Sequence, residues 1–218
     1  MPAARVSYQT STTEYNFSPR TTGTLTAPAS GNTWLVMVGV GVPAVDRPSI
    51  TLSDNQGNTY TEDTTFSDRL SSEITDKLFR CNNITNAPTT LSATWTGGAQ
   101  AIATFYVYEI SGLTAGAPLR VSTKSEAFSA DTSTSYTTTL ANEFCLLGLG
   151  GPQPFASLVG GVSSDVANQL HVADTGVVGS KTYGAILTAN NGWSQKAVFY
   201  QSSVGGGGSG FARTVMLH

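Results

Sequence analysis

The chain has 218 residues, a net charge of −3 at pH 7 and a pI near 5.2, and only 11% of its residues are charged. It has no run of Lys and Arg that would follow a phosphate backbone or an anionic lipid surface, so nucleic acid and membranes are poor partners. No apolar stretch approaches the ~20 residues of a membrane-spanning helix, and the abundance of Ser and Thr is typical of strands with hydroxyl-rich outer faces.

The first strand is expected at residues 4–9. The polar stretch that follows, residues 10–31, is rich in turn residues and holds a short strand candidate at 22–27. Residues 34–42, WLVMVGVGV, form a continuous and partly β-branched apolar run instead of an alternating one. A strand covered on both faces has this pattern, so we expect a central strand here.

Residues 49–65 are predicted to form a β-hairpin. The run SITLSDNQGNTYTEDTT has two alternating segments around a turn at residues 54–58. The Asn, Gly and Asp residues of this turn accept the left-handed or side-chain-stabilised backbone that a short hairpin requires. Ile50, Leu52 and Tyr60 have the same parity, so we expect them to share one face.

Three more strands are expected in the middle of the chain, at residues 74–81, 90–95 and 102–110. The last of them alternates and places Glu109 on an inner face near its end. A buried carboxyl group can act as a general acid or base when a partner stands nearby. No neighbour suggests such a partner, so we expect a strand-end carboxylate bonded to a backbone amide or to solvent.

The second half of the chain repeats the pattern. Residues 150–165 are expected to be a long loop that could serve as a contact site, and the Gly-rich residues 204–210 are interpreted as a flexible hairpin loop. Strands are expected at residues 119–127, 135–140, 144–149, 183–189, 197–202 and 212–217.

The sequence therefore predicts an all-β fold, an antiparallel β-sandwich of about a dozen strands that is jelly-roll-like in topology. Sandwiches of this length commonly form one domain, so we expect a single domain over residues 1–218, with residues 1–33 as a candidate N-terminal arm.

The chain offers little for catalysis. His171 lies in a strand-like run without a nucleophile motif nearby, and His218 is the last residue. Cys81 and Cys145 lie in strand-like runs, where two reduced core thiols are expected, with a disulfide between facing strands as the alternative. We expect no catalytic residues and no cofactor.

Metal binding is also not expected. The two Cys and two His lack the spacing of a zinc site. Asp54, Asn55, Asn58 and Asp63 collect oxygen atoms in and after one turn, but they depart from the spacing of a calcium loop. The turn oxygens are expected to bond their own backbone in an Asx-turn.

Aromatic side chains offer one route to ligand binding, because sugar rings stack on exposed Trp and Tyr. Trp34 and Trp95 lie in apolar strands and are expected in the core. Trp193, in a predicted turn, and the flanking Tyr183 and Tyr200 are the candidate residues of a carbohydrate platform.

The order of segments over residues 34–189 resembles a β-sandwich family seen in phage structural proteins and in bacterial surface or secreted proteins. Its recurrent features are a D-x-x-G-N-x-Y hairpin, here Asp54, Gly57, Asn58 and Tyr60, and an aromatic strand ending E-x-S-G-L, here Glu109, Ser111, Gly112 and Leu113. The resemblance implies a structural or adhesive module and brings no catalytic residues.

The N-terminus lacks the charged region and apolar core of a signal peptide, so we expect synthesis in a host cytoplasm and release in a virion. The expected function is that of a non-enzymatic phage virion protein, such as a capsid decoration, head-fibre or tail-associated subunit. It would dock on other virion proteins and on copies of itself as a homo-oligomer. The alternative is an adhesin-like module that binds a carbohydrate or a receptor. An enzyme would need an Asp beside Glu109.

Overall fold

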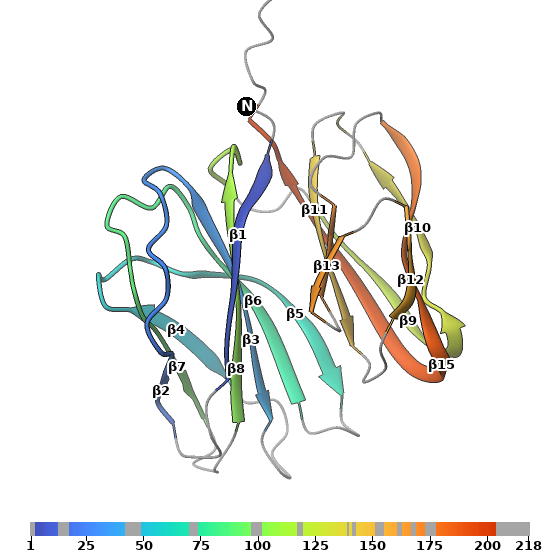
Figure 1. Ribbon diagram of the computed structural model, residues 1–218, viewed down its shortest axis with the longest axis horizontal. Helices are drawn as coiled ribbons and strands as arrows, with labels where there is room; N and C mark the ends of the chain where they lie inside the picture. Colours follow the sequence, from blue (N-terminus) through green and yellow to red (C-terminus); the bar gives the residue numbers. More distant parts are fainter. Residues whose placement is uncertain are drawn as a thin grey trace, which may run out of the picture.

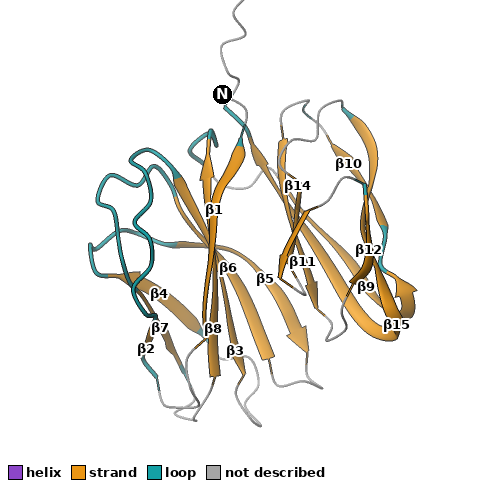
Figure 2. Cartoon of the chain, in the orientation of Figure 1, coloured by secondary structure: helices purple, strands orange, loops and turns teal. Residues whose placement is uncertain are grey.

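The computed structural model describes residues 3–12, 18–41, 49–69, 74–96, 102–116, 120–138, 140, 143–150, 155–160, 163–166, 169–172 and 178–203. These residues form fifteen strands, β1 to β15, joined by loops, and no helix (Figure 2). In particular, they include no helix long and apolar enough to cross a membrane. The strand pairings are antiparallel, and the prediction of an all-β, antiparallel fold is confirmed.

Five strands form what we call the central sheet, in the order β1-β8-β3-β6-β5 (Figure 1). Its strands are β1 (Ala4–Thr12), β8 (Ile102–Ser111), β3 (Thr33–Gly41), β6 (Ile74–Cys81) and β5 (Thr61–Arg69). Residues 33–40 of β3 are buried without exception, so the predicted strand covered on both faces is confirmed. Since successive side chains point to opposite faces, Val36 and Val38 lie on one side of the sheet and Leu35 and Met37 on the other.

A smaller sheet covers one face of the central sheet. It has the order β2-β7-β4, with β2 (Arg20–Thr21), β7 (Leu91–Trp95) and β4 (Ile50–Asp54). Between the two sheets lies the first core, where Trp34, Phe105, Leu91 and Trp95 are buried. The expectation that Trp34 and Trp95 belong to the core is confirmed, and the two sheets form a β-sandwich.

The order of the first eight strands agrees with a jelly roll only as far as β4. Strands β1 to β4 alternate between the central and the small sheet. A jelly roll would place β5 beside β4. Here β5 pairs with β6 at the edge of the central sheet, so the jelly-roll topology is not confirmed.

The prediction of a β-hairpin at residues 49–65 is wrong. The turn is present, but β4 pairs with β7 and β5 pairs with β6, so the turn carries the chain from the small sheet to the central sheet. Ile50, Leu52 and Tyr60 nevertheless pack against the same first core, as their shared parity predicted. The apolar pattern therefore predicts which side chains face the first core. It does not predict which strands pair, because those pairings are long-range contacts.

The remaining strands form the C-terminal sheet, in the order β10-β15-β11-β14-β13, with β12 and β9 also paired to β15. They are β9 (Arg120–Asp131), β10 (Thr134–Thr138), β11 (Glu143–Gly150), β12 (Phe155–Val159), β13 (Ser163–Val166), β14 (Gln169–Val172) and β15 (Gly179–Gln201).

Strand β15 organises the C-terminal sheet. Its first half pairs with β10 and β12, its second half with β9 and β11, and the pairing with β9 is irregular between Ile186 and Asn191. Figure 1 shows the strand bending back there, so that the sheet folds over itself. The second core lies inside this fold, with Tyr183 and Leu187 of the first half packed with Phe199 of the second half and Cys145 of β11.

Several predictions in the second half need correction. The two strands expected at 183–189 and 197–202, and the turn between them, are one long strand. The predicted long loop at 150–165 contains β12 and most of β13. The strand expected at residues 212–217 and the loop at 204–210 lie outside the described residues. Near the N-terminus, the candidate at 22–27 is replaced by β2, and residues 4–12, part of the expected arm, form β1.

The second face of the central sheet is covered by the C-terminal sheet. We call the apolar layer between them the interface core. Leu35, Met37 and Leu78 come from the central sheet, and Phe144 and Val198 from β11 and β15. The central sheet is therefore shared by two sandwich-like halves, which accounts for the burial of β3 on both faces.

Candidate functional site

Glu109 is the buried carboxylate that the sequence singles out, and it is 5% exposed. Its Oε1 accepts hydrogen bonds from the Ala29 amide at 2.8 Å and from Asn32 Nδ2 at 2.6 Å, and its Oε2 accepts one from Ser7 Oγ at 3.0 Å. The expected strand-end carboxylate bonded to a backbone amide is what the structure has. Because both oxygens accept internal donors, the group ties β1 and the 29–32 turn to the end of β8.

The Asp54 turn is held by its own side chains. Asp54 Oδ1 accepts the Gln56 amide at 2.8 Å and the Asn58 amide at 3.1 Å, and Oδ2 accepts Asn58 Nδ2 and the Tyr60 hydroxyl, each at 2.8 Å. Gly57 has φ +74°, the left-handed conformation that glycine adopts at low cost. The predicted Asx-turn is confirmed.

The side-chain oxygen atoms of Asp54, Asn55, Asn58 and Asp63 do not gather around one point. Asn55 Oδ1 accepts the Thr89 amide at 3.0 Å, and Asp63 faces Arg80 on the far side of the central sheet. Throughout the part of the chain that the structure describes, no three His, Cys, Asp or Glu side chains gather to hold a metal ion.

Tyr183 and Tyr200 do not form an exposed carbohydrate platform. Tyr183 is 4% and Tyr200 2% exposed, and they belong to different cores, the second core and the interface core. Neither offers a ring face to a sugar. The backbone of Trp193 lies in β15 opposite Ala127, not in a turn, and its side chain is outside the described residues.

Both cysteines are free and buried. Cys81 lies in the first core and Cys145 in the second, so the prediction of two reduced core thiols is confirmed and the disulfide alternative is wrong. Burial, with a smaller contribution from Asp54, raises the pKa of Cys81 to about 11. A thiol with such a pKa is a poor nucleophile near neutral pH. The backbone of His171 lies in β14, as its strand-like run predicted.

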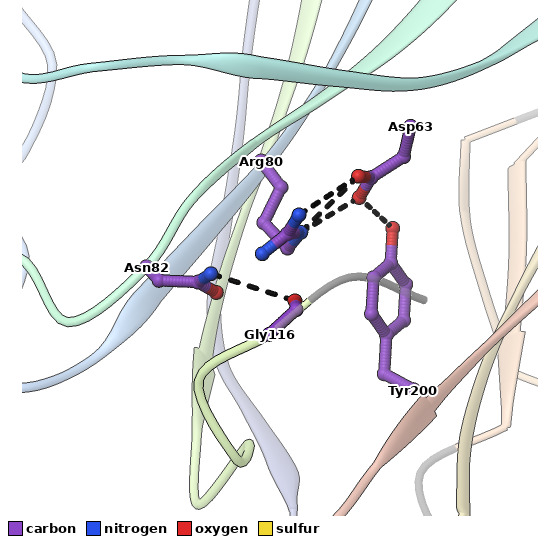
Figure 3. Close-up of polar contacts among 5 residues, drawn as sticks. All are labelled: Asp63, Arg80, Asn82, Gly116 and Tyr200. Carbon is purple, nitrogen blue, oxygen red and sulfur yellow. Dashed lines mark hydrogen bonds and ion pairs between the residues drawn. The ribbon is translucent and has the colours of Figure 1, made fainter. Parts of the chain in front are cut away.

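Sequence reasoning missed a buried polar contact that joins Asp63 of β5, Arg80 of β6 and Tyr200 of β15 (Figure 3). Arg80 Nε lies 2.9 Å from Asp63 Oδ2 and Arg80 Nη2 lies 3.1 Å from Oδ1, a bidentate pair with side chains only 7% and 2% exposed. The Tyr200 hydroxyl donates to Asp63 Oδ2 at 2.8 Å. Burial, and then the charge of Asp63, raise the pKa of Tyr200 well above its usual value.

A bulge in β5 aims the Asp63 side chain. The pairing of β5 with β6 shifts register between Glu62 and Thr64, so Asp63 is the extra residue. Arg80 has the same parity in β6 as Leu78 and therefore points into the interface core. The one local signal in the sequence is this Arg within the apolar run KLFRC, where an apolar residue would be expected.

Comparison of the chain with protein-family models, curated proteins and solved structures finds no match.

Proposed function

We propose that this chain is a non-enzymatic structural protein of a phage virion, such as a capsid decoration, head-fibre or tail-associated subunit, that acts by docking on other virion proteins and on copies of itself. The observation that carries the proposal is the use of the buried charges. Glu109, Asp63 and Arg80 are each bonded to partners that join strands or sheets, which is a structural use of buried charged groups.

The sheet edges support docking through side-chain surfaces. The edge strands β1, β5 and β13 carry bulges, and β2 has two residues. Short and bulged edges disfavour the addition of a foreign strand. Association through complementary faces, repeated by symmetry, is the mode that such a scaffold favours.

The resemblance of residues 34–189 to a family of phage structural proteins and bacterial surface proteins also supports the proposal. We favour the virion role over the adhesin-like alternative, because Tyr183 and Tyr200, two of the three aromatic side chains of the candidate carbohydrate platform, are buried. Burial of Tyr183 and Tyr200 leaves Trp193 as the single candidate for stacking on a sugar.

The test is the mass of the purified chain in solution by light scattering, followed by a glycan panel on the same sample. The proposal predicts a defined oligomer, with a mass that is a whole multiple of 22.7 kDa, and no glycan binding. A monomer that binds a sugar, with binding lost in Trp193→Ala and kept in the matched buried variant Tyr183→Phe, would replace it with the carbohydrate-binding alternative.

A further inference from the structure

The end of β15 contacts the first half of the chain at several points. The Ala3 amide donates to Ser202 Oγ at 2.7 Å, the Thr114 amide donates to the Gln201 carbonyl at 2.9 Å, and the Ser203 amide donates to the Gly112 carbonyl at 2.6 Å. Leu113 forms a β-bridge with Ser202. In Figure 1 the end of β15 accordingly lies beside the start of the chain.

Tyr200 adds a contact from inside the interface core. Its backbone pairs with Phe144 of β11, so the residue belongs to the C-terminal sheet. Its hydroxyl crosses to Asp63 of the central sheet, as Figure 3 shows. Residues 200–203 therefore reach three separate places in the first half: strand β5, the N-terminus and the turn at 112–114.

The acceptor on β5 is prepared for this contact. The bulge turns Asp63 inward, and the bidentate pair with Arg80 fixes the orientation of its carboxylate. A buried polar group left without its partner is costly, whereas apolar contacts in the same layer tolerate small displacements. The polar contacts thus favour one orientation of the C-terminal sheet against the central sheet, whereas the apolar contacts of the interface core alone would allow several.

We infer that residues 200–203 form a clasp that locks the C-terminal half onto the central sheet. Releasing the clasp loosens the interface core while the first and second cores stay closed. The clasp is thus a conformational device that makes two sandwich-like halves behave as one body, independently of what the protein docks on.

The accessibility of each of the three cores can be measured separately by thiol labelling. Met37, 1% exposed, lies in the interface core, so Met37→Cys introduces a probe there. The native Cys81 and Cys145 report on the first and second cores in the same molecule. Labelling rates of the three thiols are read by peptide mass spectrometry on the full chain, with and without Tyr200→Phe and Ser202→Ala.

The clasp predicts that the combined Tyr200→Phe and Ser202→Ala substitutions raise the labelling rate of the introduced thiol at least tenfold, and leave the rates of Cys81 and Cys145 within twofold. The matched control is Thr132→Val, which removes a buried hydroxyl bonded to Ala185 inside the C-terminal sheet and should not change labelling of the introduced thiol. An unchanged rate at the introduced thiol, an equal rise at all three thiols, or the same rise in the control would overturn the inference.

Discussion

Glu109 and Glu62 have the same side chain in opposite surroundings. Glu109 is buried and accepts three internal hydrogen bonds, whereas the side chain of Glu62 is 38% exposed and pairs with Lys77 at 2.8 Å. Glu109→Ala leaves the part-buried donors of Ser7, Ala29 and Asn32 without their acceptor, so we expect it to lower the free energy of unfolding by about 1–3 kcal/mol. Glu62→Ala, as the control, should cost less than about 1 kcal/mol in the same urea titration. Equal losses would show that burial of Glu109 does not determine its contribution.

The buried thiol of Cys81 and the hydroxyls of Tyr60 and Tyr200 make the free energy of unfolding fall at high pH. Burial raises the pKa of Cys81 from 9.0 to about 11 and raises those of Tyr60 and Tyr200, so the unfolded chain releases these protons at lower pH than the folded chain. The stabilisation is complete below pH 9 and is lost as the pH rises, by about 2–3 kcal/mol for Cys81 between pH 9 and 11. Urea unfolding of Cys81→Ala should show a shallower decline over this range than the parent chain. The same slope in both proteins would contradict the assignment.

Strand β15 requires glycine where its first half passes the loop before β10. Gly184 has φ +157°, and a Cβ there would lie 2.6 Å from Ser133 Cα, a backbone atom that cannot turn away. We expect Gly184→Ala to cost about 3 kcal/mol or more of unfolding free energy. Gly57→Ala is the control, because Gly57 also has a positive φ, +74°, but a Cβ there meets nothing within 4 Å. That variant should cost about 1–2 kcal/mol from backbone strain alone. A Gly184 variant as stable as the Gly57 variant would refute the steric argument.

The sequence predicted elements better than it predicted their partners. The strand expected at residues 74–81 matches β6, and the double-sided burial of β3 followed from its continuous apolar run. The Asp54 turn was recognised from its residue types, but such a turn serves a hairpin and a crossing between sheets equally well. Pairing of β4 with β7 decided between them, and that is a long-range contact.

The polar site was beyond prediction for a similar reason. Tyr200 and Asp63 are separated by 137 positions, and a bulge that depends on pairing with β6 aims the carboxylate. The strand pattern around Tyr200 does not reveal which face is covered, so the sequence alone leaves Tyr200 as a candidate binding residue. By contrast, the structural role of Glu109 could be anticipated, since its own strand pattern placed it on an inner face near a strand end.

At the scale of the whole molecule, the scaffold consists of three apolar layers and the polar contacts between them. The first and second cores lie inside the two halves, and the interface core joins them across the central sheet. The proposed docking on a symmetric particle would use surfaces that this joined scaffold presents.

The most direct test of the proposed virion role is sedimentation of phage particles from cells that encode this chain, with peptide mass spectrometry across the density gradient. The proposal predicts that the chain peaks with intact particles, in a constant ratio to the major capsid protein through repeated banding. A chain that remains at the top of the gradient while particles band without it would contradict the proposal.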